Sequence, residues 1–209
     1  MASDDSPIDG TRRSDDRARE FDASYQGTPP WDIGRPQPAF AEQASLGAIT
    51  GRVLDVGCGT GEHALLAAEL GLDASGLDLS PRAIERARAK ANRRHLTVDF
   101  FTASALEMEG TGATYDTVLD CGLFHVFDDQ ERALFVRNLR AALVRGGRYL
   151  MLCFSDLEPG DWGPRRVSRA EIESSFAHGW SIDSIEAATS EITIEERSAH
   201  AWLVTATRR

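Results

Sequence analysis

The chain has 209 residues, of which 42% are hydrophobic, and its formal net charge is −10. This length predicts one domain with a sizeable core, or one domain with extensions. The acidic balance argues against nucleic acid or an anionic membrane as a partner, because phosphate groups demand a basic surface. The apolar runs fall short of the roughly 18 residues of a membrane span, and we expect a cytoplasmic protein without a signal peptide.

The three cysteines, Cys58, Cys121 and Cys153, are odd in number and widely spaced, and each lies in or next to an apolar run. Their pattern predicts reduced, buried thiols rather than a disulfide framework or a zinc site. We therefore expect no metal in this protein.

The first fifty residues divide into two parts. Residues 1–20 hold six acids and four arginines with almost no aliphatic side chains, which predicts a mobile tail. Residues 21–38 place aromatic side chains among prolines and glycines, and predict an ordered loop. Residues 38–49 have apolar side chains at helical spacing and predict a helix on a sheet, so residues 21–50 form an N-terminal segment ahead of a domain over residues 51–209.

The chain is organised around residues 53–71, whose pattern predicts a strand, a glycine turn and a helix. Glycine stands at every second position of the turn, at Gly57, Gly59 and Gly61. Glycine tolerates the positive φ values of a tight turn and lets a ligand approach the backbone at the start of the helix. The dinucleotide fingerprint G-x-G-x-x-G needs its third glycine where this chain has Glu62, which argues against a NAD-dependent oxidoreductase.

The next predicted strand, residues 72–78, ends in Asp78. Ser80 and Pro81 follow it and predict the start of a helix over residues 82–90. A carboxylate at the end of the second strand can accept hydrogen bonds from both hydroxyls of a ribose. The glycine turn and the spaced acid together predict a site for a cofactor that contains a nucleoside.

The pattern Asp-x-Gly-x-Gly-x-Gly, which begins at Asp55, resembles motif I of the class I S-adenosylmethionine (SAM) methyltransferases. The resemblance implies SAM as the cofactor and S-adenosylhomocysteine as its product. It also implies an α/β fold with a Rossmann-like sheet of seven strands in the order 3-2-1-4-5-7-6, the last strand antiparallel and helices on both faces. The cofactor-binding residues implied in this way are Tyr25, Trp31, Asp55, Gly57, Gly59, Thr60, Gly61, Asp78, Leu79, Ser104, Ala105, Asp120, Cys121 and Gly122.

Residues 25–34 read Tyr-x-Gly-x-x-Pro-Trp-Asp-x-Gly and resemble the N-terminal segment of thiopurine methyltransferase-like enzymes and bacterial thiol and quinone methyltransferases. In those relatives the segment folds over the cofactor. An aromatic face attracts a cationic sulfonium, so we expect Trp31 in a lid that excludes water. The alternative is that Tyr25 and Trp31 only cover the core beneath a long loop.

Strands and helices alternate along the rest of the chain. The predicted strands are residues 96–101, 115–120, 148–154, 180–193 with a turn, and 200–206. The predicted helices are residues 132–144, which end at Gly146-Gly147 after a capping pair of Asp128 and Glu131, and residues 169–177, which follow a capping box of Ser168 and Glu171.

Class I relatives often carry an acid at the position of Ser104, where it contacts the adenine amino group. Adenine recognition is therefore left here to the Ser104 hydroxyl and to backbone groups near Ala105.

His125 follows the fourth strand and is the candidate general base, since histidine removes protons near neutral pH. Its alternative role is to shape the pocket. Phe124, Trp162 and Arg165 are further candidates for the substrate pocket. Cys121 is expected to pack against the cofactor rather than to act as a nucleophile.

The sequence therefore predicts methyl transfer from SAM to a small, hydrophobic or aromatic acceptor at a thiol, a phenol or hydroquinone, or a heterocyclic nitrogen. Proximity supplies much of the rate in such a reaction. A non-catalytic SAM-binding regulatory module stays open as the alternative, and the NAD-dependent oxidoreductase is disfavoured by the glycine spacing. The oligomeric state is left open.

Overall fold

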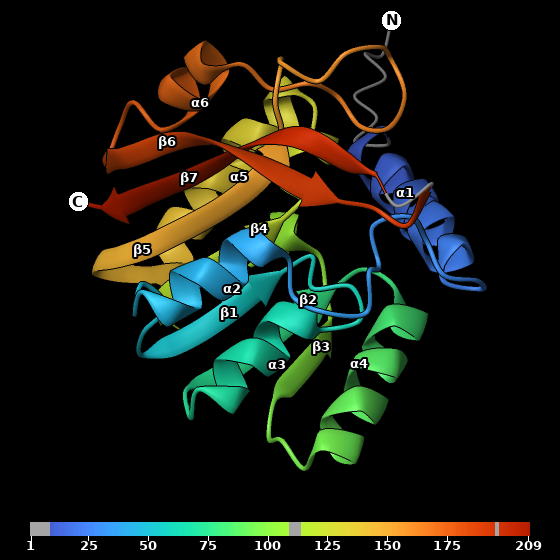
Figure 1. Cartoon of the computed structure of the whole chain (residues 1–209). Coiled ribbons are helices and arrows are strands. Elements are labelled where there is room, and N and C mark those ends of the chain that lie inside the picture. Colours follow the sequence, from blue (N-terminus) through green and yellow to red (C-terminus); the bar gives the residue numbers. More distant parts are fainter. Residues whose placement is uncertain (1–8, 109–113, 195–196) are drawn as a thin grey trace, which may run out of the picture.

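One mixed sheet of seven strands runs through the molecule, with helices on both of its faces (Figure 1). The computed structural model describes residues 9–108, 114–194 and 197–209. The strands lie in the order β3-β2-β1-β4-β5-β7-β6, and β7 is antiparallel to both of its neighbours, which confirms the predicted topology. The strands are β1 (Arg52–Val56), β2 (Asp73–Asp78), β3 (Asp99–Thr102), β4 (Tyr115–Cys121), β5 (Leu143–Phe154), β6 (Trp180–Glu191) and β7 (Ser198–Arg208).

The helices cover the two faces because neighbouring residues on a strand point to opposite sides. On one face, Val53 and Leu119 pack in a cluster with residues of α2 and α3. On the other face, Leu54 and Val118 pack with residues of α5 and α6. The helices are α1 (Asp9–Ser24), α2 (Pro38–Ser45), α3 (Glu62–Glu69), α4 (Pro81–Arg94), α5 (Asp129–Ala142) and α6 (Arg169–Ser175), and two short 3-10 turns are η1 (Ala105–Glu107) and η2 (Phe124–Val126).

The predicted helix starts are confirmed at three places. The Ser80 hydroxyl accepts a hydrogen bond from the first turn of α4, at 3.1 Å. Asp128 and Glu131 form a reciprocal capping box at α5, and Ser168 and Glu171 form another at α6. These caps satisfy backbone N–H groups that have no partner inside the helix.

Residues 9–24, expected as the end of a mobile tail and the start of a loop, form α1 (Figure 1). That expectation was wrong because composition does not reveal the tertiary contacts of this helix. Arg17 donates two hydrogen bonds to the Glu131 carboxylate, at 2.8 and 2.9 Å, and its guanidinium lies 5.7 Å from the centroid of the Phe127 ring. Residues 1–8 of the expected tail lie outside the described residues.

The boundary between α5 and β5 also differs from the prediction. The helix ends at Ala142 and the strand begins at Leu143, so the predicted helix end and strand start were both too late. Leu143 has an extended backbone (φ −88°, ψ 147°), is fully buried, and pairs with Tyr115 on β4. Strand β6 runs without the predicted turn and has only a local irregularity of register between Ile182 and Ser184.

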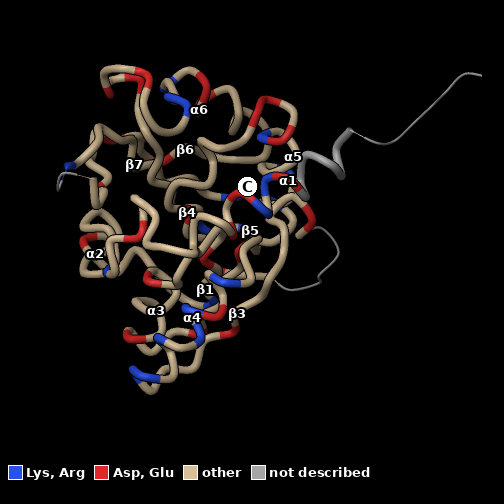
Figure 2. The backbone as a smooth tube through the Cα atoms, turned by 90° about the vertical axis from the view of Figure 1, so that its right-hand side faces the viewer, with Lys and Arg blue, Asp and Glu red and all other residues tan. Residues whose placement is uncertain are grey.

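Acidic and basic residues are interspersed over the described chain, and some of them lie on the strands (Figure 2). The acids on the strands include Asp55, Asp78 and Asp120, which are buried near the carboxyl ends of β1, β2 and β4. No helix among the described residues is both long and apolar enough to cross a bilayer. The buried carboxylates direct attention to the edge of the sheet at which these three strands end.

Candidate active site

A cavity of about 520 Å³ lies beyond the carboxyl ends of β1, β2 and β4. Its size is that of a small-molecule site, and its position is the one at which open parallel sheets bind ligands. Its walls come from the glycine turn and strand ends, from α1 and residues 25–37, and from segments after β5 and around the β6–β7 connection. The predicted site residues that line it are Tyr25, Trp31, Gly57, Gly59, Thr60, Asp78, Leu79, Ser104, Ala105, Cys121, Gly122, His125 and Trp162.

The turn between β1 and α3 requires glycine for space as well as for conformation. Gly59 has a φ of +52°, and a Cβ atom added there would lie 2.7 Å from the Tyr25 hydroxyl oxygen. Gly61 has a φ of +85°, and its added Cβ would lie 2.7 Å from the Phe100 ring. The backbone of the turn is therefore packed on one side and open to the cavity at Gly57 and Gly59.

Asp78 is the last residue of β2, and it fixes the glycine turn between β1 and α3 by hydrogen bonds. One of its carboxylate oxygens accepts a hydrogen bond from Gly59 N–H at 2.9 Å, and the other accepts one from Ser80 N–H at 2.8 Å. Burial raises the pKa of this carboxyl group, and the two backbone N–H groups oppose that rise. A carboxylate oxygen has more than one lone pair, so both oxygens can still accept hydrogen bonds from a ligand in the cavity.

Residues 25–34 lie across the cavity as an ordered strap. The Trp31 indole N–H donates to the Tyr25 hydroxyl at 3.0 Å, and the two rings meet edge to face. Tyr25 is buried, and burial, with the nearby Asp78 charge, raises the pKa of its phenol. Trp31 remains 45% exposed even though it lines the cavity, so the strap is packed at Tyr25 and open at Trp31.

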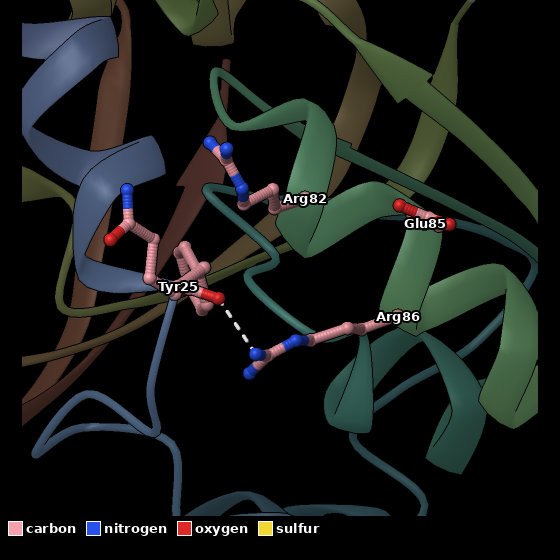
Figure 3. A pocket seen from close by; sticks show the side chains of 5 residues that line it. Tyr25, Arg82, Glu85 and Arg86 are labelled. Carbon is pink, nitrogen blue, oxygen red and sulfur yellow. Dashed lines mark hydrogen bonds between the residues drawn. The ribbon is translucent and has the colours of Figure 1, made fainter.

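Helix α4 holds this strap from outside the cavity. The Arg86 guanidinium donates to the backbone carbonyls of Tyr25 and Gly27, at 2.6 and 2.8 Å (Figure 3). A smaller hollow of about 380 Å³ lies here, lined by Tyr25, Gln26, Arg82, Glu85 and Arg86. Its two arginines are engaged with the strap and with Asp22 at the end of α1, so this hollow marks where the N-terminal segment docks.

The strap and the residues that follow it are fastened to the end of β6 and to the β6–β7 connection. The Gln37 side chain donates to the Glu191 carbonyl at 2.9 Å and accepts from Glu191 N–H at 2.8 Å. Thr193 N–H donates to the Pro30 carbonyl at 2.8 Å. Segments from the two ends of the sequence therefore close one side of the cavity together.

A partly buried ion network joins the strap to the glycine turn. Lys90 donates to the Thr60 hydroxyl at 2.5 Å and to the Glu62 carboxylate at 2.7 Å. Glu62 also accepts two hydrogen bonds from Arg94, at 2.9 and 3.0 Å. The Thr60 hydroxyl in turn donates to Asp32 of the strap at 3.0 Å. Each carboxylate of the network is thereby paired.

Two predicted cofactor-binding acids, Asp55 and Asp120, do not line the cavity. Asp55 is buried beneath the turn and accepts a hydrogen bond from Ala64 N–H in the first turn of α3, at 3.2 Å. Asp120 accepts from the Tyr149 hydroxyl at 2.6 Å and from Leu123 N–H at 2.8 Å. Burial raises the pKa of Asp120 to about 6, against the lowering effect of these bonds. Both acids hold the backbone that forms the site.

Gly61, Phe124 and Arg165 also do not line the cavity. Gly61 starts α3 against the Phe100 ring, as described above. Phe124 is fully buried and stacks on Phe176 at 5.9 Å, in the core between the sheet and α6. Arg165 is exposed and donates hydrogen bonds to Asp129, at 2.8 Å, and to Glu171. Neither side chain forms part of the walls of this cavity.

His125 lines the cavity, but its geometry does not favour a general base. Phe154 N–H donates to His125 Nδ1 at 3.0 Å. Burial lowers the pKa of the imidazole to about 3, and the charges of Arg166 and Arg132 contribute to the shift. A neutral histidine that already accepts a backbone hydrogen bond fits the alternative role of shaping the pocket.

Sequence reasoning missed most of the apolar lining. These residues come from α1, from η1, from η2 and the residues on either side of it, and from the last third of the chain. They include Phe21, Leu106, Leu123, Val126, Phe127, Phe154, Pro164, Ile192 and Ile194. One signal was available, because Arg17 and Phe21 are four residues apart and share a face of a helix. No local pattern announces the others, since they meet only through the fold.

The cavity fits SAM by the chemistry of its lining. A buried carboxylate with free lone pairs stands at the end of β2 beside an open glycine backbone, which suits the hydroxyls and the sugar of a nucleoside. The Ser104 hydroxyl accepts from Leu106 N–H at 3.1 Å and keeps its own hydrogen to donate. Among the described residues, no cluster of histidine, cysteine and acidic side chains could hold a metal ion. Fold and site thus define an α/β domain for a nucleoside-containing cofactor.

Comparison with known proteins gives the family. Residues 53–147 match the family model described as a methyltransferase domain. A 2-heptyl-1-hydroxyquinolin-4(1H)-one methyltransferase of Mycobacteroides abscessus is 35% identical over 179 residues, which cover 80% of this chain and 79% of the relative. A probable thiol methyltransferase 2 of Arabidopsis thaliana is 32% identical over 155 residues, or 70% of this chain and 66% of the relative.

A solved structure from work on the conversion of a disulfide bond into a thioacetal group during echinomycin biosynthesis has a TM-score of 0.85. It is 37% identical to this chain, and the match covers 91% of this chain and 92% of that structure. The chain belongs to the class I SAM-dependent methyltransferases. It is therefore an enzyme with SAM as its cofactor, and neither the NAD-dependent oxidoreductase nor the non-catalytic module describes it.

Proposed function

We propose that the enzyme transfers the methyl group of SAM to a small, hydrophobic or aromatic acceptor at a thiol, a phenol or hydroquinone, or a heterocyclic nitrogen. The observation that carries this proposal is the apolar part of the cavity. We call its residues Phe21, Phe127, Phe154, Trp162, Ile192 and Ile194 the acceptor end, and the turn at residues 57–60 with Asp78 and Ser104 the cofactor end. Apolar walls of this kind favour an acceptor that leaves water readily.

The acceptor end offers aromatic surfaces at several angles. Phe154 meets Trp162 edge to face at 5.4 Å, and the same Phe154 ring meets His125 edge to face at 5.3 Å. Phe21 meets Trp31 at 5.9 Å on the strap side. The Arg166 guanidinium lies 5.4 Å from the centroids of both the Phe154 and the Trp162 ring. The aromatic character of this wall supports an aromatic acceptor.

The relatives support the same class of acceptor. The Mycobacteroides abscessus relative is named for a hydroxyquinolinone that carries a heptyl chain, and the Arabidopsis thaliana relative for a thiol. Both names describe small molecules.

We propose that the chain contributes binding, orientation and exclusion of water. SAM, when bound, supplies a methyl group made electrophilic by a positive sulfur. Asp78 accepts hydrogen bonds from the ribose, Trp31 offers an aromatic face to the positive charge, and the strap of residues 25–34 keeps water out. Held in line, the acceptor then reacts mainly through proximity.

A mass-spectrometric product screen tests the proposal. The full chain is incubated with SAM that carries a deuterated methyl group and with matched thiols, phenols and nitrogen heterocycles. We expect a labelled product from at least one class, and its loss in Asp78→Ala. Transfer to none of these, but to a peptide or a nucleic acid, would contradict the proposed acceptor. The cytoplasmic location and the lack of a nucleic-acid partner remain predictions from composition.

A further inference from the structure

The two histidines that line the cavity are both held as acceptors of backbone hydrogen bonds. Phe154 N–H donates to His125 Nδ1 at 3.0 Å, and Gln37 N–H donates to His63 Nε2 at 3.2 Å. A neutral imidazole has one acceptor nitrogen, and its other nitrogen carries the proton. Neither ring can take a proton from a substrate without giving up the backbone hydrogen bond that orients it.

Burial keeps both rings neutral. It lowers the pKa of His63 to about 4, and it lowers the pKa of His125 to about 3 with the help of the Arg166 and Arg132 charges. A hydrogen bond to the Gly122 backbone opposes the shift at His125. An effective general base has a pKa near the operating pH, so neither histidine suits that role.

The other ionisable side chains of the lining are also engaged. They are Arg17, Tyr25, Asp32, Arg35, Cys58, Glu62, Asp78 and Cys121. The carboxylates sit in the polar networks described above, and each arginine is paired with a glutamate. Burial raises the pKa of the phenol and of both thiols, which therefore keep their protons. Within the described lining, no group stands ready to remove a proton at neutral pH.

We infer that the acceptor reaches the site already ionised, so that the enzyme selects small hydrophobic molecules whose thiol, hydroxyl or ring N–H has given its proton to water. The inference rests on the proposed methyl transfer and narrows its acceptor to acidic molecules. The reaction then balances without a base. The acceptor's anion forms a bond to the methyl carbon while the bond from that carbon to sulfur breaks, its electron pair stays on sulfur, and the acceptor's proton is already in bulk water.

A series of para-substituted thiophenols and phenols tests the inference, because the substituent changes acidity with little change of shape near the reacting atom. The kcat/KM of the full chain is measured against pH for each acceptor. We expect it to rise about tenfold per pH unit and to level off at the pKa of that acceptor, so that the inflection moves along the series. An inflection at one pH for every acceptor would assign the proton to a group of the protein and overturn the inference, while methyl transfer itself would stand.

A binding measurement gives a readout independent of turnover. With S-adenosylhomocysteine present, the absorbance of 4-nitrothiophenol reports whether the thiolate or the thiol is bound. We expect the thiolate, with a dissociation constant that falls as pH rises to the pKa of the thiol. Preferential binding of the neutral thiol would overturn the inference.

His125→Asn separates the two remaining roles of this residue, because the asparagine carbonyl can still accept from Phe154 N–H. The inflection should continue to follow the acceptor in this variant. Loss or displacement of the inflection would make His125 the base. If no acceptor in the series is bound or methylated, the thiol and phenol classes of the proposed acceptor fail, and this inference fails with them.

Discussion

The two ends of the cavity are built in opposite ways. The cofactor end is polar, and its main contacts are hydrogen bonds from the backbone N–H groups of Gly59 and Ser80 to the Asp78 carboxylate, all in or directly after the β1–α3–β2 unit. The acceptor end is apolar, and its side chains come from α1, from the turn before α5, and from segments beyond β5. One end is therefore fixed by local geometry, and the other only by the packing of the whole chain.

Because the two ends are built differently, substitutions at each end should have different effects. A backbone turn held by a buried carboxylate has little freedom to change without losing its ligand. Apolar walls made of loops and a terminal helix can exchange side chains of similar size at small cost to the fold. We expect cofactor binding to depend on few residues and acceptor selectivity to depend on many.

The largest expected effect tests a feature that both ends share, a neutral buried histidine. The pKa of His63 is lowered from 6.5 to about 4 in the folded state. Between these values the unfolded chain binds a proton that the folded chain does not, so stability falls as the pH drops from 6.5 to 4. The gap corresponds to about 3 kcal/mol.

His63→Gln, which can still accept from Gln37 N–H, should remove this contribution. Denaturant unfolding of the variant and the parent enzyme, repeated between those pH values, measures it. His178→Gln is the matched control, because His178 is exposed on the surface. Equal acid sensitivity in His63→Gln and the parent would show that His63 is not the group that charges on unfolding.

The second effect breaks the cofactor end alone. Asp78→Ala removes the proposed acceptor of the ribose hydroxyls and also releases Gly59 N–H and Ser80 N–H. We expect the affinity for S-adenosylhomocysteine to fall by about 1.5–3 kcal/mol, because hydrogen bonds to a charged group are lost. Titration calorimetry checks it. Asp73→Ala, at the exposed start of the same strand, should bind normally; equal loss in both variants would point to damage to β2 instead.

The same contrast explains what the sequence could predict. The strand order was implied by the resemblance to class I methyltransferases, whereas the glycine turn and the caps at Ser80 and Ser168 follow from local spacing, and the structure has all of them. Motif I also led to Asp55, and the position at the end of the fourth strand led to Asp120, but their burial beneath the backbone depends on how β1 and β4 pack, which spacing does not report. Local patterns therefore identify the polar turn, but they do not distinguish the acid that lines the cavity, Asp78, from Asp55 and Asp120, which lie beneath the backbone.

The acceptor end could not be predicted for a related reason. Helix α1 has the composition of a tail, and its contacts are with residues distant in sequence: Arg17 binds Glu131, which is 114 residues away, and Asp22 binds Ser80. Arg165 stands in the loop predicted to cover the acceptor, yet its side chain turns outward to Asp129. In an irregular loop the side chains follow no helical or strand periodicity, so the sequence does not predict which way each side chain points.

The third effect concerns the strap that joins the two ends. Trp31→Ala removes an aromatic face and the hydrogen bond to the Tyr25 hydroxyl. We expect SAM affinity to fall by about 1–2 kcal/mol, the scale of one partly desolvated cation–π contact. Hydrogen exchange of residues 21–38 should also slow when S-adenosylhomocysteine binds. Leu70→Ala is a control of similar exposure, 48% against 45% for Trp31. If hydrogen exchange of residues 21–38 does not respond to S-adenosylhomocysteine, and Trp31→Ala turns over like the parent enzyme, then Trp31 only covers the core.

The fourth effect breaks the acceptor end alone. Trp162→Ala removes a ring that lines the cavity and meets Phe154. The KM for an aromatic acceptor should rise about tenfold, which is about 1.4 kcal/mol, without a change in SAM affinity. Leu157→Ala, in the same loop but 56% exposed and outside the lining, should leave both constants unchanged. A matching loss of SAM affinity in Trp162→Ala would mean that the two ends are not independent.

The smallest expected effect tests whether the contacts of α1 contribute to acceptor binding, as its position beside the acceptor end suggests. Arg17 and Glu131 form a bidentate ion pair, and their side chains are 23% and 18% exposed. The Arg17 guanidinium also lies against the Phe127 ring. A partly exposed pair of this kind contributes about 0.5–1 kcal/mol. Arg17→Met keeps most of the apolar stem and loses the charge. Glu131 also caps α5, so Glu131→Gln tests the partner while a polar side chain remains at that position.

A double-mutant cycle on acceptor KM and on unfolding free energy isolates the pair from these other roles. We expect a coupling of about 0.5–1 kcal/mol in the unfolding free energy and a rise of a fewfold in acceptor KM, with SAM affinity unaffected. High salt should reduce the coupling, because the pair is only partly shielded from water. Coupling in SAM affinity instead would show that α1 acts on the strap through Phe21 and Trp31, and would move this helix from the acceptor end to the cofactor end.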